Sequence, residues 1–266
     1  AITLIAERGR LMGELPEGGA MAAVFAPIDV VRARLEPEFA GRVSVAALNA
    51  PANTVVSGDA DAVDALVVAL AGDGVESRAL RVSHAFHSHH MDPILDRFRA
   101  AAQKIKHAAP RIEVIANVTG ERAESSTFGP DYWRRHIREP VQFSRSVEAM
   151  REEGVTALIE VGPAPVLLGL AAEGPGADED EIHIPSLRPG QQATRALLEA
   201  IGRLYVAGGS VDWARIYPGP LHPVELPAYP FQRQRNWFAE RKAPSAERGV
   251  HPLLGRSIES PRFAGT

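Results

Sequence analysis

The sequence predicts an α/β protein in which a small ferredoxin-like βαββαβ unit is followed by a longer α/β alternation. Three observations predict this class. Short strand-like segments alternate with two helical segments over residues 20–82, and a longer α/β alternation follows from residue 83. The chain has 266 residues, of which 45% are hydrophobic, so it can bury the core of one large or two small domains.

The first expected element is a helix over residues 1–8, which ends before a break at Gly18-Gly19. No capping residue precedes this helix, and a natural domain rarely begins in mid-helix. The sequence is therefore expected to be a fragment of a longer protein.

The small unit is expected to contain four strands and two helices. The turn-rich residues 49–53 suit a hairpin link, Asp59 is a helix-capping residue type, and Gly72 and Gly74 are typical helix stops. Two helices on one face of a four-stranded antiparallel sheet give the ferredoxin-like arrangement. The expected elements are strand 20–25, helix 28–35, strand 43–48, strand 54–56, helix 59–72 and strand 77–82.

The larger subdomain is expected to add helices and longer strands. Asp92 and Pro93 suit the start of a helix lined by apolar residues from Ile94 to Ile105. The apolar run 155–161 predicts a strand that is buried on both faces of a parallel sheet. The remaining expected elements are strand 112–118, a helix with Val147 and Met150, helix 197–205, an irregular proline-rich segment 217–230 and a polar segment 240–249.

Composition excludes several function classes. The net charge of −4 and the absence of a long basic tract argue against nucleic acid as a partner. No apolar run is long enough for a membrane span, and no secretory leader is visible. The chain has no cysteine, which excludes disulfides, thiolate zinc sites and cysteine nucleophiles. A cytoplasmic location fits these features.

The segment Ser83-His84-Ala85-Phe86-His87-Ser88 is the strongest candidate for chemistry. A histidine at a strand-to-helix corner can face a cleft, and imidazole exchanges a proton near neutral pH, as a general base must. The cluster of His84, His87, His89 and His90 also raises a metal site, although no HExxH pattern is present. Helix capping or packing by these histidines is a third possibility, and the residues alone leave all three open.

A histidine base usually needs a nucleophile, and the sequence offers none in a known frame. No G-x-S-x-G motif occurs in the 266 residues. Ser57 and Ser210 lack the glycine frame of this motif, and Ser88 is too close to His87 in sequence for productive attack. Either the chain does not work like a hydrolase, or its nucleophile lies outside it.

Several motifs in the same order give the sequence a specific resemblance. Together they resemble the acyltransferase domain of modular type I polyketide synthases, followed by its linker and the opening of a dehydratase domain. The motifs are Ala6-Glu7-Arg8-Gly9-Arg10-Leu11-Met12, Asn49-Ala50-Pro51, Ser83 to Ser88, Tyr132-Trp133, Arg138-Glu139-Pro140-Val141, Glu160-Val161-Gly162-Pro163, Tyr229-Pro230-Phe231-Gln232-Arg233 with Trp237, and His251-Pro252-Leu253-Leu254-Gly255.

This resemblance implies a fold and a division of the chain. The large subdomain would be hydrolase-like and incomplete, with the ferredoxin-like small subdomain inserted in it. The implied parts are 1–19 for the end of the first large-subdomain segment, 20–82 for the small subdomain, 83–207 for the rest of the large subdomain, 208–240 for the linker, and 241–266 for a flexible segment and the dehydratase start.

The resemblance also implies a reaction. In the family, a serine in a GHSxG motif takes a malonyl unit from malonyl-CoA and passes it to the phosphopantetheine thiol of an acyl carrier protein. His87 matches the family's base, and the serine would precede Ala1 by roughly twenty residues. The domain would bind no cofactor or metal, and its neighbours in the polypeptide would be ketosynthase and dehydratase domains.

Five further residues are implied at the substrate site. Arg8 matches the arginine that grips the substrate carboxylate with its planar guanidinium. Asn49 would support the site by hydrogen bonding, and the backbone carbonyl of His136 would orient the base. His84 belongs to the same motif as the base. Phe86 would select malonyl over methylmalonyl units, because a phenyl ring fills the space of a 2-methyl branch at a cost of ~1 to 3 kcal/mol.

Three alternatives to a polyketide synthase acyltransferase remain. A malonyl/acetyl transferase of a fatty acid synthase shares much of the architecture. A non-catalytic module that docks an acyl carrier protein would use the same surface without chemistry. A metal-dependent hydrolase would use the histidine cluster. The isolated chain is expected to be inactive and poorly folded, because its sheet would lack the strands that precede the serine motif.

Overall fold

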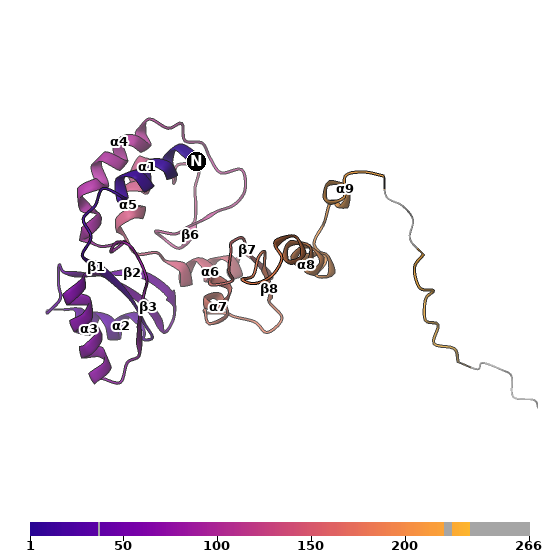
Figure 1. The fold of residues 1–266 in the computed structure, drawn as a ribbon, viewed down its shortest axis with the longest axis horizontal. Coiled ribbons are helices and arrows are strands. Elements are labelled where there is room, and N and C mark those ends of the chain that lie inside the picture. Colours follow the sequence, from indigo (N-terminus) through magenta and orange to yellow (C-terminus); the bar gives the residue numbers. More distant parts are fainter. Residues whose placement is uncertain (37, 221–224, 235–266) are drawn as a thin grey trace, which may run out of the picture. The chain divides into compact units, whose positions relative to one another are not determined.

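The β-strands and helices form a mixed α/β structure (Figure 1). The computed structural model describes residues 1–36, 38–220 and 225–234. The chain divides into two compact units, Ala1–Asp212 and Trp213–Thr266. The elements are α1 (Ile2–Met12), β1 (Gly19–Val24), α2 (Ile28–Leu35), β2 (Val43–Ala50), β3 (Asn53–Asp59), α3 (Ala60–Gly72), β4 (Ser77–Ala79), the 3-10 helix η1 (His89–Ile94), α4 (Leu95–Gln103), β5 (Ile115–Ala116), β6 (Glu121–Arg122), α5 (Pro130–Arg138), α6 (Phe143–Glu152), β7 (Ala157–Glu160), α7 (Leu167–Ala172), β8 (Ile182–Pro185), α8 (Ala193–Val206) and α9 (Trp213–Ile216).

The elements from β1 to β4, which lie within the first of these units and are called the small unit below, have the predicted ferredoxin-like arrangement. Its strands follow the order β2-β3-β1-β4, and each neighbouring pair is antiparallel. Successive residues of a strand point to opposite faces, so Ala22 and Val24 of β1 pack with α2 and α3 in one core. Met21 and Ala23 point to the other face, where they pack against Phe86. The second face of the small sheet therefore meets the histidine segment.

Three local predictions in the small unit were wrong in detail. The predicted link 49–53 is only a turn at Pro51-Ala52, because β2 and β3 pair as far as Ala50 and Asn53. The strand predicted over 77–82 ends at Ala79, after which the Leu80 amide donates one more bond to Met21. Asp59 occupies the N-cap position of α3, but its carboxylate makes no capping bond and binds histidines instead.

The start of the next helix also differs from the prediction. Ser88, and not Asp92, caps the segment, since its Oγ accepts the amide of His90 at 3.2 Å. A 3-10 turn that contains Pro93 then precedes α4. A 3-10 start is a common way to begin a helix. The helix itself buries Leu95 and Phe98, as the apolar pattern predicts.

The strand predicted over 112–118 is reduced to a two-residue strand, β5, in a hairpin with β6. A turn ends it: Gly120 has φ of 71°, and its amide donates to Ala116 at 2.8 Å. A positive φ is available to glycine without steric cost, so this residue stops the extended segment. Alternating apolar residues alone did not reveal the turn.

The strands β7 and β8 are parallel, as predicted for 155–161. The expectation that this strand is buried on both faces was wrong, because Ile159 is 48% exposed. Its buried neighbour Leu158 packs with α6 and α7 on one face. A buried ion pair between Arg151 of α6 and Glu181 ties the same layer together at 2.7 Å.

Several predicted features of the second unit lie outside the described residues, namely Trp237, the polar segment 240–249, and the dehydratase-like segment 241–266. The proline-rich residues 217–220 and 225–230 form no helix or strand, as predicted. In the part of the chain that is described, no helix combines the length and the apolar content that a membrane span requires.

Candidate active site

The histidine segment makes a sharp corner between β4 and η1. His87 has φ of 59°, and among the described residues it is the one non-glycine with a positive φ. Ser88 is fully buried and holds the corner, since its Oγ donates to the Ala85 carbonyl at 2.6 Å. Gly19 lies so close that a Cβ atom there would stand 2.4 Å from the Ala85 Cβ. Such backbone strain is held in place by surrounding contacts and clusters at functional sites.

The ring of His87 has a defined tautomer. Its Nδ1 lies 2.8 Å from the backbone carbonyl of Glu139, and a carbonyl can only accept, so Nδ1 carries the proton. The lone pair is therefore on Nε2. Burial lowers the pKa of His87, and the charges of Arg8 and Arg138 lower it further. The geometry gives a neutral imidazole with an unprotonated Nε2, which is the form a general base needs.

The carbonyl that orients His87 belongs to Glu139, whereas the sequence reading assigned this role to the carbonyl of His136. Helix α5 ends at Arg138, and Pro140 holds Glu139 in an extended conformation with ψ of 156°. The next residue, Val141, exchanges backbone bonds of 2.9 Å with Ala46 and Leu48 of β2. The small sheet thus anchors the segment that orients the base. The motif Arg138-Glu139-Pro140 could have indicated that the Glu139 carbonyl is free to bind His87, because proline turns the preceding carbonyl out of a helix.

Arg8 reaches the same region from α1. Its Nη1 donates to Nδ1 of His136 at 3.1 Å, and the rings of His87 and His136 lie 6.4 Å apart. Within the described residues Arg8 forms no ion pair with a carboxylate. Burial lowers its pKa, but an arginine remains charged at any ordinary pH. A half-buried guanidinium without a counter-ion is suited to an anionic ligand.

His136 binds Arg8 through its side chain, whereas the resemblance implied a role only for its backbone carbonyl. Burial, followed by the charge of Arg8, lowers the pKa of His136 to about 4. The ring is therefore neutral, with its lone pair on Nδ1 toward the guanidinium and its proton on Nε2. Since 128 residues separate the two side chains, their spacing in the sequence gave no signal of the pair.

The other three candidates lie nearby in different settings. Phe86 packs against apolar clusters of both the small sheet and the helical layer. His84 donates from Nε2 to the Leu15 carbonyl at 3.1 Å, so its ring tethers the chain between α1 and β1. Asn49 stands at the end of β2, and its Nδ2 donates to the side chain of Asn53 at 3.4 Å.

The four-histidine metal site raised by the sequence does not form. His84 and His87 bind the separate carbonyls of Leu15 and Glu139. His89 and His90 turn away and bind the carboxylate of Asp59. The corner at His87 divides the cluster, because a positive φ reverses the direction of the backbone.

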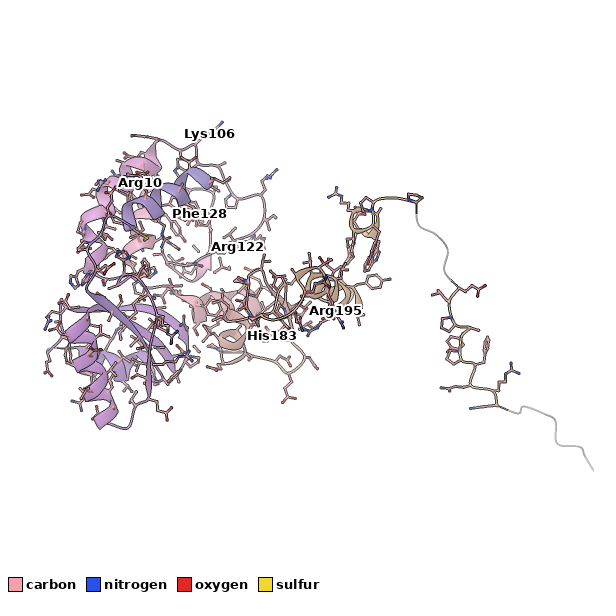
Figure 2. The ribbon with its side chains drawn as sticks, in the orientation of Figure 1. Arg10, Lys106, Arg122, Phe128, His183 and Arg195 are labelled. Atoms are coloured by element: carbon pink, nitrogen blue, oxygen red, sulfur yellow. The ribbon has the colours of Figure 1, made fainter. Side chains whose placement is uncertain are left out.

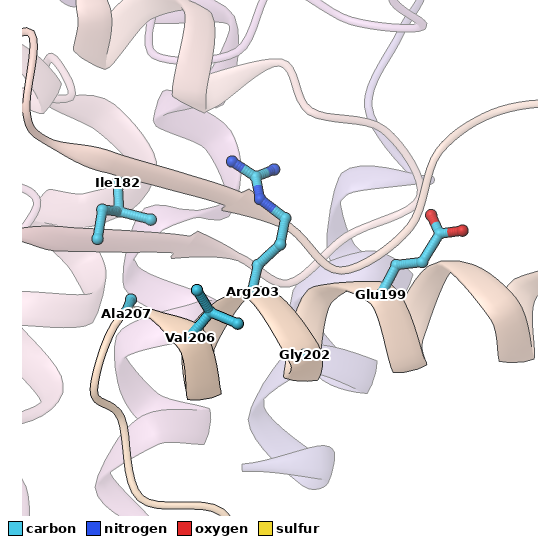
Figure 3. Close-up of a pocket in the computed structure, with 6 residues that line it drawn as sticks. All are labelled: Ile182, Glu199, Gly202, Arg203, Val206 and Ala207. Atoms are coloured by element: carbon cyan, nitrogen blue, oxygen red, sulfur yellow. The ribbon is translucent and has the colours of Figure 1, made fainter. Parts of the chain in front are cut away.

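A cavity of about 740 Å³ lies between β8 and α8, and Figure 3 shows its lining. Ile182 and Val206 supply apolar walls, and Arg203 and Glu199 supply the charged groups. None of these residues belongs to the cluster around His87. The cavity therefore carries no part of the candidate active site.

We expect His136 to titrate near pH 4 in the folded chain and near its ordinary value of 6.5 in the unfolded chain. The unfolded state then binds more protons between these values, so stability falls as the pH drops from 6.5 toward 4. The variant His136→Asn keeps an acceptor for Arg8 and loses this contribution. Urea unfolding from pH 4 to 7 should show a shallower decline for the variant, and parallel curves would contradict the assignment.

The comparisons with known proteins support an acyltransferase. The family model described as "Acyl transferase domain" matches residues 1–211. Polyketide synthase GfsA of Streptomyces halstedii is 38% identical over 97% of the chain, and mycoketide-CoA synthase of Mycobacterium tuberculosis is 40% identical over 100%. The chain spans only 4% and 6% of the lengths of these two relatives.

Solved structures give the same result. The acyltransferase domain from the second module of the salinomycin polyketide synthase is 43% identical, with a TM-score of 0.77 over 81% of this chain and 51% of that chain. The acyl transferase domain of SpnD, solved in complex with 2-(pent-4-yn-1-yl)malonyl, is 35% identical with a TM-score of 0.70 over 77% of this chain and 50% of that chain. The sequence, the fold and the relatives agree: this chain belongs to the acyl transferase domain family, as found in modular type I polyketide synthases.

Proposed function

We propose that this chain supplies the base and the carboxylate-binding arginine of an acyltransferase that moves a malonyl unit from malonyl-CoA to an acyl carrier protein. One observation carries the proposal. An unprotonated Nε2 of His87 and a guanidinium of Arg8 that has no carboxylate partner among the described residues lie in one half-buried cluster. This pair combines a base with a site for an anionic acyl group. The malonyl group bound by the SpnD domain has such a carboxylate, which supports the substrate class.

The first half-reaction would begin at a serine outside the 266 residues, since no G-x-S-x-G frame lies within them. His87 would take the hydroxyl proton on Nε2 as the serine oxygen attacks the thioester carbonyl. The tetrahedral intermediate would then expel the thiol of coenzyme A, which would leave with the proton from His87. The Nδ1 bond to Glu139 would keep the ring oriented throughout.

The second half-reaction would reverse these roles. His87 would deprotonate the phosphopantetheine thiol of the acyl carrier protein, and the thiolate would attack the acyl-serine. The serine would recover the proton as it leaves. Arg8 would hold the malonyl carboxylate through both steps, because the carboxylate takes no part in bond making. No cofactor is required for this double displacement.

The test uses the complete acyltransferase polypeptide, extended upstream to the proposed serine motif. Incubation with radiolabelled malonyl-CoA should label the enzyme, and addition of the acyl carrier protein should move the label to it. Transfer of the acetyl group from radiolabelled acetyl-CoA at the same concentration should be much slower. If neither an acyl-enzyme nor labelled carrier protein forms while the carrier protein still binds, the chain is a docking module and the proposal fails.

We also expect Phe86 to control the choice of extender unit. The ring packs beside the His87 corner between two apolar clusters, so Phe86→Ser would open a space there. Its removal should raise the specificity constant for methylmalonyl-CoA relative to malonyl-CoA by roughly 10- to 100-fold. The ratio of the two constants is the readout, because it does not depend on the folded fraction of the variant. An unchanged ratio would refute this role.

Asn49 and His84 enter the proposal as supporting residues. His84 would hold the corner through its bond to the Leu15 carbonyl, and Asn49 would face the substrate from the end of β2.

The proposal also includes the linker at 208–240, a dehydratase start within 241–266, and a ketosynthase domain in the same polypeptide. The order of the sequence motifs supports the linker and the dehydratase start. Identities of 38% and 40% to polyketide synthases over 97% and 100% of the chain, against 28% to MCAT from Streptococcus pneumoniae, favour a polyketide synthase over a fatty acid synthase.

A further inference from the structure

A second histidine cluster lies outside the candidate active site. His89 and His90 donate from their Nε2 atoms to the same carboxylate oxygen, Oδ1 of Asp59, at 3.0 and 2.9 Å. Their ring centroids are 4.6 Å apart. We call Asp59, His89 and His90 the Asp59 cluster. Two imidazole nitrogens therefore converge on one carboxylate oxygen.

The three ligand atoms have the chemistry of a transition-metal site. Two imidazoles and one carboxylate form a common protein donor set for Zn²⁺ and related divalent ions, with water in the remaining position. In the described part of the chain, the Asp59 cluster is the group of such residues whose ligand atoms all lie within 4.8 Å of one another. We propose that the Asp59 cluster binds a divalent transition-metal ion, with Zn²⁺ as the representative ion.

The present distances are close to those of a loaded site. Tetrahedral coordination with bonds of ~2.0 to 2.1 Å separates neighbouring ligand atoms by about 3.3 Å. The nitrogen-to-oxygen distances of 2.9 and 3.0 Å would therefore need to open by only a few tenths of an ångström. Side-chain rotation can supply such a change without moving the backbone.

The hydrogen bonds of the Asp59 cluster also permit a metal ion to replace the two Nε2 protons. To bind a metal, each Nε2 must give up its proton, and the ring proton then resides on Nδ1. Nδ1 of His89 is buried without a hydrogen-bond partner in the structure, so no existing bond fixes that tautomer. The side chains of His89 and Asp59 are 34% and 29% exposed, which leaves a path for an ion from solvent. Arg42 binds the opposite oxygen, Oδ2, at 3.0 Å and would keep Oδ1 directed at the histidines.

The site would connect two parts of the fold. Asp59 ends β3 of the small unit, whereas both histidines lie in η1, directly after the His87 corner. A bound ion would link these elements at a point that now depends on two hydrogen bonds. It would thereby stabilise the corner without contacting the His87 ring, which faces Glu139.

The experiment measures metal binding and stability on the full 266-residue chain, with no activity assay. Zn²⁺ at about 100 times its dissociation constant should raise the melting temperature by roughly 5 to 10 °C. Co²⁺ should bind in a 1:1 ratio and show visible absorption bands of a low-coordinate site. The double variant His89→Gln/His90→Gln keeps donors toward Asp59 but removes both nitrogen ligands, so it should lose the Co²⁺ bands and the melting shift.

The matched control is His183→Gln. His183, labelled in Figure 2, also bonds a carboxylate, that of Glu181 at 2.6 Å, but among the described residues it belongs to no group of three possible metal ligands. This variant should bind Zn²⁺ and Co²⁺ as the parent chain does. If the double variant and Asp59→Asn bind both ions as tightly as the parent, or if neither ion binds the parent chain, the proposal is overturned. Failure of malonyl transfer would leave this result untouched, so the two proposals are tested separately.

Discussion

His87→Asn should reduce malonyl transfer by roughly 100- to 10,000-fold in the complete acyltransferase polypeptide, because the variant removes the base and little else. Asparagine tolerates the positive φ of 59° at this corner better than most residues. Its side-chain amide can also donate to the Glu139 carbonyl, as Nδ1 of the histidine does at 2.8 Å. What it lacks is an acceptor at the position of Nε2. Single-turnover formation of the acyl-enzyme from radiolabelled malonyl-CoA measures the effect.

His107→Gln is the matched control for this experiment. His107 is also half-buried and also binds a backbone carbonyl, that of Ala102 at 2.9 Å. Its replacement should leave acyl-enzyme formation within about twofold of the parent, because this ring binds the carbonyl of Ala102 in the last turn of α4 and has no role as a base. If both variants lose activity to the same extent, the loss reflects folding, and His87 has no special role. Melting temperatures of the variants decide between these outcomes.

The small unit could be predicted from sequence because its signals are local. The continuous apolar run from Met21 to Val24 marks a strand with two buried faces, and the spacing of Val63, Leu66 and Leu70 marks one helix face. Each element carries its own periodicity, so the order βαββαβ follows directly. The strand ends were less predictable, since β4 stops at Ala79 where pairing stops, and pairing is a tertiary property.

The candidate site was predicted in its residues but not in its contacts. The motif around His87 pointed to a base, yet the carbonyl that orients it comes from Glu139, 52 residues away. The side chain of His136 contacts Arg8, which lies 128 residues away in the sequence, and no sequence spacing reveals such a pair. The separation of His89 and His90 from His87 depends on one backbone angle. Contacts between distant elements need the folded chain.

Arg8→Ala should remove the preference for a carboxylate-bearing acyl group. A hydrogen bond to a charged group contributes about 1.5 to 3 kcal/mol, so losing two of them should lower kcat/KM for malonyl-CoA by roughly 100- to 1000-fold or more. The rate with acetyl-CoA, which lacks the carboxylate, should change only a few-fold. Arg8→Lys keeps the charge but not the planar pair of donors, so it should recover only part of the loss.

The control for Arg8 lies two residues further along the same helix. Arg10, labelled in Figure 2, is exposed and pairs with Glu7 and Glu14. Arg10→Ala removes one surface charge from α1 and should leave the ratio of malonyl to acetyl transfer unchanged, because exposed ion pairs contribute little. If the transfer rates with malonyl-CoA and acetyl-CoA fall to the same extent in Arg8→Ala, the residue only supports His136 and the fold. A loss of kcat/KM confined to malonyl-CoA would show that the guanidinium of Arg8 is where the substrate carboxylate binds.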